Sequence, residues 1–293
     1  MREDMEVLQG GIDMHAHTAP ALFRRPIDDM ELAKIAREYG MRGFVLKDHD
    51  SMTCGRAYYV KKNVAGIEPI GAVVLNRSVG GINPYVVQAA IHYGARVIWM
   101  PSNHSKYHAE FYGISDYPQL GRPKRQLKGT GVTVLTQTGE LTPEALQVLD
   151  IVAENDVCLA TGHLSYAEID KLLTEAVKRG VKRMIVTHAN WSLCKLSIDK
   201  QKHLLETGAY LEYVAVSCVS PTFYEQTPKE LAEWIKTVGS DKLLLASDLG
   251  QYSGPSHPEG LRMLSASLLD EGVRNRDLVR MLSENPVKVL GLN

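Results

Sequence analysis

The sequence has few cysteines, no excess of basic residues and no long apolar run. Its 293 residues include four cysteines with no C-x-x-C pair, so we expect reduced thiols rather than a disulfide framework. Lysine and arginine number 33 against 34 aspartates and glutamates, which disfavours nucleic acid as a partner. No stretch approaches the roughly 18 apolar residues of a membrane span, and the first residues lack the basic-then-apolar order of a signal peptide. We therefore expect a cytoplasmic protein with no membrane partner.

Short apolar runs alternate with amphipathic stretches along the whole chain, a pattern typical of parallel strands joined by helices. No glycine-rich phosphate loop follows the first run, which disfavours the alternative of a doubly wound open sheet. The pattern predicts an α/β fold, a (β/α)8 TIM barrel, as a single domain over residues 1–293. Eight strands are expected, at Gly11–His15, Gly43–Lys47, Pro69–Leu75, Arg96–Met100, Val157–Thr161, Arg183–Thr187, Ala209–Val216 and Lys242–Ser247.

One connection is much longer than the others. Residues Ser102–Leu141 follow the fourth predicted strand and contain several aromatic residues and an apparent hairpin at 130–141. Long connections in compact domains are usually functional. We therefore expect this insertion to cover the barrel mouth as a lid and to shape the choice of substrate.

Histidines and an aspartate stand at the ends of five predicted strands. His15 and His17 end the first strand, His49 follows the second, and the others are His163, His188 and Asp248. In a (β/α)8 barrel these strand ends surround one mouth, where active sites are built. Nitrogen and oxygen donors of this kind suit zinc, or manganese or iron, and leave a coordination position for water. Taken alone, each of these histidines is better explained as a surface or hydrogen-bonded core residue. Taken together, they favour a divalent metal site.

The residues at these strand ends, with the C-terminal stretch, resemble the amidohydrolase superfamily of metal-dependent barrels. The resemblance spans nearly the whole chain and rests on the H-x-H of His15 and His17, on His163, His188 and Asp248, and on the ending Glu284-Asn285-Pro286-Val287-Lys288-Val289-Leu290-Gly291-Leu292. More narrowly, it is similar to an amidohydrolase-related group in Val45-Leu46-Lys47-Asp48-His49, Ala160-Thr161-Gly162-His163-Leu164-Ser165 and Asp248-Leu249-Gly250-Gln251.

The resemblance implies a role for each of these residues. It implies that His15, His17, His163 and Asp248 bind the metal, and that Asp248 exchanges protons with the reacting water and the leaving group. His188 would lie beside these ligands or hold a weaker second ion, and would stabilise the developing oxyanion. Both Asp248 and His188 are therefore expected to be catalytic.

The chain departs from the superfamily pattern at the end of the fourth strand, where members with two metals usually carry a bridging lysine or glutamate. That strand continues as Trp99-Met100-Pro101-Ser102-Asn103-His104. Glu140 in the insertion, or a carboxylated Lys47, could replace the bridge, although Glu140 is better explained as a hairpin residue and Lys47 lies on another strand. One metal is therefore favoured, and two remain an alternative.

The substrate contacts are expected around the same mouth. Alternation along the second strand places Lys47 and His49 on one side, and Asn103 follows the fourth strand. Arg24 and Arg25 follow the H-x-H and have a geometry that suits a carboxylate, a hint of a small, anionic substrate. Plain solvated surface charge explains two adjacent arginines slightly better.

Hydrolysis of an amide, cyclic amide, lactone or related ester is the first functional hypothesis. The alternative is a decarboxylase or hydratase with one metal that acts on a small carboxylic acid, because the missing bridge and the arginines suit that chemistry. A metal-binding scaffold is disfavoured, since structural sites lack the vacant position that catalysis needs. A homo-oligomer is compatible with the sequence.

Overall fold

The computed structural model describes residues 2–113, 131–194 and 196–293. Within them, nine short strands occupy the eight predicted positions, because the predicted strand at 69–75 is split in two. The strands are β1 (Ile12–Ala16), β2 (Gly43–Leu46), β3 (Glu68–Ile70), β4 (Ala72–Val74), β5 (Val97–Trp99), β6 (Cys158–Ala160), β7 (Met184–Val186), β8 (Tyr210–Val214) and β9 (Leu243–Ala246).

The split falls at Gly71, between β3 and β4. β3 pairs with β2, whereas β4 pairs with β5, so the two halves of this one segment face different neighbours. A Cβ atom at Gly71 would lie 2.6 Å from the Cα atom of Cys54, where helix α3 (Cys54–Asn63) begins. The helix backbone therefore approaches this strand more closely than any side chain would allow.

All strand pairs are parallel and the sheet closes on itself. The hydrogen-bonded order is β1-β2-β3 followed by β4-β5-β6-β7-β8-β9. Closure comes from the segment after β9: the amide of Asp248 donates to the carbonyl of His15, and the amide of His17 donates to the carbonyl of Leu249. The predicted barrel is thus confirmed, and its closing seam joins the two segments that carry the H-x-H and Asp248.

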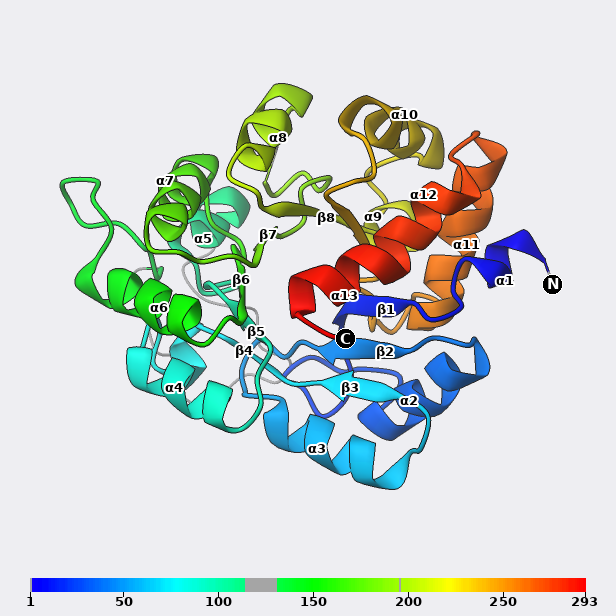
Figure 1. Ribbon diagram of the computed structural model, residues 1–293, viewed down its shortest axis with the longest axis horizontal. Helices are drawn as coiled ribbons and strands as arrows, with labels where there is room; N and C mark the ends of the chain where they lie inside the picture. The colour runs from blue at the N-terminus through cyan, green and yellow to red at the C-terminus, as the bar shows by residue number, and fades with distance from the viewer. Residues whose placement is uncertain (1, 114–130, 195) are drawn as a thin grey trace.

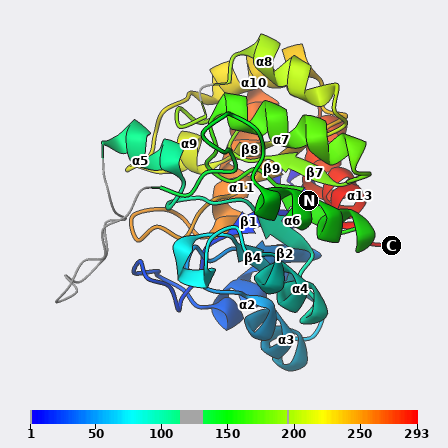
Figure 2. The same cartoon turned by 90° about the vertical axis from the view of Figure 1, so that its left-hand side faces the viewer.

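Helices surround the barrel, as Figures 1 and 2 show from two directions. The apolar stripes beginning at Leu32, Ala145, Ile169 and Leu231 are buried against the strands in α2, α6, α7 and α10. Burial of each such Leu or Ile side chain contributes about 1.5 to 3 kcal/mol. The helices besides α3 are α1 (Glu3–Glu6), α2 (Asp29–Glu38), α4 (Pro84–His92), α5 (Lys106–Tyr112), α6 (Pro143–Glu154), α7 (Tyr166–Lys178), α8 (Ile198–Leu205), α9 (Val216–Val219), α10 (Pro228–Val238), α11 (His257–Asp270), α12 (Asn275–Val279) and α13 (Asn285–Leu290), with a 3-10 turn at Arg77–Val79 and a π-helical turn at Arg280–Glu284.

The barrel interior is apolar at one end and polar at the other. Inward-facing residues of the strands, such as Met14 and Trp99, form one cluster with Val289 and Leu290 of α13. In Figure 1, α13 lies against β1, and it closes the barrel at the amino ends of the strands. The polar strand ends described below therefore open only toward the opposite mouth.

The insertion is described only in part. Residues 102–113 include α5, and a parallel bridge joins Ser105 to Val132 in the second described part. Asn103, His108 and Tyr112 line the cavity at the mouth. An antiparallel bridge between Leu135 and Leu141 agrees with a hairpin there. The rest of the expected lid, residues 114–130, lies outside the described residues, so the lid stays a prediction.

The sequence predicts no membrane span and reduced cysteines. Among the described helices, none is long and apolar enough to cross a membrane. All four cysteines are buried, free thiols.

Candidate metal centre at the carboxyl ends of the strands

The two histidines of the H-x-H reach the cavity side of the barrel through a β-bulge in β1. Met14 packs in the barrel interior, whereas Ala16 packs in the outer layer between strands and helices. The pairing register of β1 with β2 shifts by one residue between Asp13 and Ala16. This extra residue lets His15 face inward soon after Met14, and bulges of this kind commonly re-aim a side chain next to an active site.

Asp13 holds the bulge in place. Its Oδ1 accepts hydrogen bonds from the amides of His15 (3.1 Å) and Ser247 (2.9 Å), so one carboxylate ties β1 to the end of β9. Complete burial raises the pKa of Asp13 to about 7, although the hydrogen bonds from Ser247 oppose that rise.

His188 and Asp248 stand at strand ends in an unusual backbone conformation. Their φ angles are +54° and +50°, in the left-handed region that non-glycine residues seldom adopt. Such conformations concentrate at functional sites, where the surrounding structure holds them. The turn that carries Asp248 is held by close packing: a Cβ atom on Gly250, two residues later, would lie 2.0 Å from the carbonyl oxygen of His17. The turn after β9 can therefore press against β1 only with glycine at this position.

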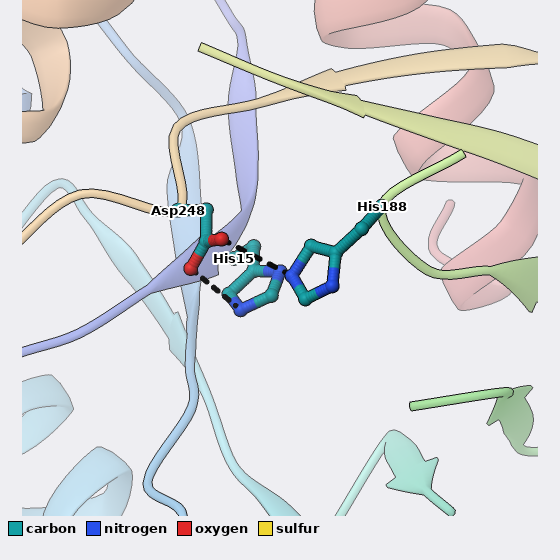
Figure 3. A group of neighbouring side chains, drawn as sticks. All are labelled: His15, His188 and Asp248. Carbon is teal, nitrogen blue, oxygen red and sulfur yellow. Dashed lines mark ion pairs between the residues drawn. The ribbon is translucent and has the colours of Figure 1, made fainter. Parts of the chain in front are cut away.

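Three histidine side chains converge on the carboxylate of Asp248. The Nε2 atoms of His15 and His17 each lie 3.1 Å from Oδ1 of Asp248, and Nε2 of His188 lies 3.1 Å from Oδ2. Figure 3 shows the rings of His15 and His188 next to each other, each paired with one oxygen of this carboxylate. All four side chains are buried. The cluster thus joins the ends of three different strands: His15 is on β1, His188 follows β7 and Asp248 follows β9.

The arrangement fits a divalent cation. Ligand atoms that each lie about 2.1 Å from one ion are roughly 3.0 to 3.4 Å apart, which matches the three 3.1 Å distances around Asp248. Two nitrogens nearby lack hydrogen bonds: Nε2 of His188, despite its closeness to Asp248, and Nε2 of His163, which has no partner among the described residues. Buried polar atoms normally find a partner, so these nitrogens indicate a missing one.

Burial also sets the protonation states that metal binding requires. Removal from water lowers the pKa of His15, His17 and His163 well below the ordinary value, so these rings are neutral and have a lone pair to offer. Burial alone would raise the pKa of Asp248, but the adjacent His15 and His188 hold it well below its usual range. Neutral imidazoles around an ionised carboxylate form a typical zinc ligand set.

The positions of His163 and His188 differ from the expected division of roles. His188 was expected beside the ligands, yet it lies as close to Asp248 as His15 does. The His163 ring lies 4.9 Å from the His188 ring, and its Nδ1 is 2.8 Å from Nδ1 of His108 instead. The compact cluster of candidate metal donors among the described residues is therefore His15, His188 and Asp248, with His17 and His163 next to it.

Two charged residues contact His15, one at each ring nitrogen, and Lys47 is at Nε2, the nitrogen that also faces Asp248. Glu212 on β8 lies 3.1 Å from Nδ1 of His15, and Nζ of Lys47 lies 2.9 Å from Nε2 of the same ring. Burial raises the pKa of Glu212 to about 7 and lowers that of Lys47 to about 8. Carboxylate partners of this kind orient a metal-binding histidine, which is the role of Glu212 toward His15. Glu212 was not identified as a site residue from the sequence. The available signal was a glutamate at an inward-facing position of an otherwise apolar strand.

Other predicted contacts also face this mouth. Nδ1 of His49 lies 2.8 Å from Oγ of Ser102, and the Arg24 guanidinium lies 4.6 Å from the centre of the Tyr252 ring. The cavity has a volume of about 530 Å³. Its lining residues are His17, Phe23, Arg24, Arg25, Lys47, His49, Asn103, His108, Tyr112, His163, His188, Trp191, Val216, Phe223, Asp248, Gln251 and Tyr252.

Glu140 is not part of this site. Its carboxylate pairs with Lys171 at 2.8 Å, on the outer side of the barrel beside α7. His257 begins α11, and its Nε2 lies 3.0 Å from the carbonyl oxygen of His17. It therefore supports the backbone of the H-x-H.

Solved structures of several metal-dependent enzymes have a similar fold. An amidohydrolase from Pseudomonas aeruginosa matches with a TM-score of 0.62 at 12% identity, over 98% of this chain and 97% of that one. The metallopeptidase dipeptidase AC matches with a TM-score of 0.63 at 12% identity, over 97% and 98%. The phosphotriesterase homology protein of Escherichia coli, with phosphate in its active site, matches with a TM-score of 0.56 at 15% identity, over 97% and 99%. At these identities the similarity concerns the fold.

The chain belongs to the family of unknown function DUF6282, whose family model matches residues 10–212. That segment runs from β1 into β8 and includes both histidines of the H-x-H and Glu212. No functionally curated protein matches the sequence.

Proposed function

We propose that this protein is a metal-dependent hydrolase that uses an activated water on an amide, cyclic amide, lactone or related ester of a small molecule. One observation carries the proposal: nitrogens of His15, His17 and His188 lie 3.1 Å from the buried carboxylate of Asp248, beside a cavity at the carboxyl ends of the strands. Active sites of (β/α)8 barrels are built at that end.

His15, His17, His188 and Asp248 would hold the metal, with His163 as the adjacent fifth donor. This set of nitrogen and oxygen donors favours zinc, with manganese or iron as alternatives. When bound, such an ion lowers the pKa of a coordinated water toward about 7 and polarises the bond under attack. We favour one ion, because the end of β5 supplies no bridging carboxylate among the described residues and Glu140 faces away.

Asp248 and His188 are the proposed catalytic residues. The Asp248 carboxylate would take a proton from the attacking water and return it to the leaving group, because it stays ionised among its histidine neighbours. Nε2 of His17 lies 3.1 Å from Oδ1 of Asp248, a spacing at which the ring and the carboxylate could share one ion. His188, whose ring lines the cavity and whose Nδ1 has no hydrogen-bond partner among the described residues, would stabilise the developing oxyanion from that nitrogen.

The proposed substrate contacts are Lys47, His49, Arg24, Arg25 and Asn103, all of which line the cavity. Arg24, Arg25 and Lys47 carry positive charge there, whereas Asp248 is the one carboxylate among the lining residues that the structure describes. Arg24 lies against the Tyr252 ring, which holds a guanidinium at the cavity. This balance of charge favours a small molecule with an anionic group.

A screen of matched compounds tests the proposed hydrolysis. Purified protein loaded with zinc, manganese or iron would be incubated with small lactones, cyclic amides and linear amides, each with and without a carboxylate. We expect turnover of at least one cleavable bond, and faster turnover of the member that carries the carboxylate. Absence of turnover across all metals and bond types would contradict the hydrolase proposal.

The same screen distinguishes the proposed hydrolase from a second candidate function, a metal-dependent decarboxylase or hydratase that acts on a small carboxylic acid. The cationic cavity and the absence of a bridging carboxylate at β5 favour it. Release of carbon dioxide, or addition of water to a double bond, from an acid without a hydrolysable bond would identify this activity.

A variant of Lys47 tests whether this lysine contacts the substrate or is carboxylated and binds a second metal. We expect Lys47→Met to raise the KM for an anionic substrate about tenfold, because a cation beside His15 would be lost from the cavity. The matched control is Lys61→Met, which removes an exposed lysine paired with Glu68. Unchanged KM and kcat would exclude a role for Lys47. An intact mass with an added carboxylate, together with two metals per chain, would replace the one-metal arrangement.

A further inference from the structure

His108 joins the insertion to the metal centre through a hydrogen bond between two imidazoles. Nδ1 of His108 lies 2.8 Å from Nδ1 of His163, and their rings are nearly parallel, with centroids 4.9 Å apart. Both residues are buried. A nitrogen–nitrogen contact this short needs one donor and one acceptor, so the pair shares a single proton between these two atoms.

The two ways of placing that proton have different consequences for His163. When both rings are neutral, each carries one N–H, and the 2.8 Å contact requires one of these hydrogens to lie between the two Nδ1 atoms. If His163 donates from Nδ1, its Nε2 has a free lone pair. If His108 donates, His163 must carry its hydrogen on Nε2, and that nitrogen cannot bind a cation.

The surroundings of His163 favour the first arrangement. Its Nε2 is buried and has no hydrogen-bond acceptor among the described residues, so an N–H there would be left unpaired. The same ring lies 4.9 Å from the His188 ring, which places His163 at the edge of the cluster around Asp248. A lone pair on Nε2 is what a metal at this cluster would require.

Hydrogen bonds of Ser105 to the main chain of His108 and of His163 hold the two residues together. Ser105, the N-cap of α5, donates from Oγ to the carbonyl oxygen of His163 (2.6 Å) and accepts from the amide of His108 (3.0 Å). The start of α5 is thereby attached to His163 through its main chain as well as through its side chain.

We propose that His108 is a positioning residue that accepts a hydrogen bond from Nδ1 of His163 and so presents the lone pair of His163 Nε2 to the metal. The inference rests on the proposed function, since it assigns His163 to the same metal centre. It links the insertion after β5 to metal affinity as well as to the substrate cavity. Partners of this kind typically change metal affinity by about 10- to 100-fold.

Three variants test this role by metal affinity. His108→Phe keeps a planar ring but removes the acceptor, whereas His108→Asn places an amide oxygen near the former Nδ1. Tyr107→Phe is the control on the same helix, outside the cavity lining. Zinc affinity would be measured by competition with a chromophoric chelator, and the site geometry by the visible spectrum of the cobalt form. We expect about 10- to 100-fold weaker zinc binding and an altered cobalt spectrum for His108→Phe, recovery within a few fold for His108→Asn, and no change for Tyr107→Phe.

A second readout needs no metal. Nitrogen-15 NMR of the histidine rings in the metal-free wild-type protein should show His163 protonated at Nδ1, and His108→Phe should abolish that preference. Wild-type zinc affinity in a folded His108→Phe protein, or a His163 proton on Nε2 in the wild type, would overturn the inference. Failure of the wild type to bind any divalent metal would instead contradict the proposed function, and the NMR result would still decide the role of His108.

Discussion

Replacement of Asp248 by asparagine should lower kcat by about a hundredfold to ten-thousandfold while the protein stays folded. Loss of a positioned general base and acid typically costs this much. Asparagine has the same size and keeps an oxygen at the position of Oδ1, which lies 3.1 Å from Nε2 of His17. It cannot take up a proton from water. Steady-state kinetics on the substrate found by the screen would measure the effect.

Two controls make the Asp248 result specific. Glu110→Gln removes an exposed carboxylate on α5, 3.8 Å from Lys106, and should leave kcat unchanged. Circular dichroism would show that the Asp248→Asn protein keeps its secondary structure, and metal analysis would show how much metal it retains. A kcat near the wild-type value would remove Asp248 from the mechanism.

Removal of the metal should abolish turnover and lower the free energy of unfolding. A ligand at 100 times its Kd stabilises the folded state by about 2.7 kcal/mol, provided that it does not bind the unfolded chain. The donors here come from segments as distant in sequence as His15, His188 and Asp248, so the unfolded chain cannot assemble them. Urea unfolding of chelator-treated and zinc-loaded protein would measure the difference.

Metal specificity provides the control for this experiment. Zinc added back should restore both activity and stability, whereas magnesium should restore neither, because magnesium prefers oxygen ligands and three of the proposed donors are imidazoles. Full activity in protein from which all divalent metal has been removed would contradict the proposed mechanism.

The barrel and the place of its site could be predicted because both follow from simple periodicities. Carboxyl ends of parallel strands meet at one mouth, so residues directly after apolar runs, such as His188 and Asp248, must lie near each other. Alternation along β2 placed Lys47 and His49 on one side, and both line the cavity. Both placements follow from the order of the elements and the period of a strand.

The remaining features depend on contacts that no local pattern encodes. The bulge in β1 is held by Asp13 through the amide of Ser247, more than 200 residues away. The split at Gly71 reflects the approach of α3 to the strand. Glu212 lies within the apolar run Ala209–Val216, whose pattern predicts only a strand. His108 lies on α5 and lines the cavity, where it contacts His163.

Anomalous diffraction from crystals grown with zinc tests the metal centre most directly. We predict one strong peak at the zinc edge, with His15, His17, His188 and Asp248 within about 2.0 to 2.2 Å of the ion and His163 Nε2 facing it. A zinc ion elsewhere, or an ordered site in which Asp248 and the histidines do not contact the metal, would contradict this prediction.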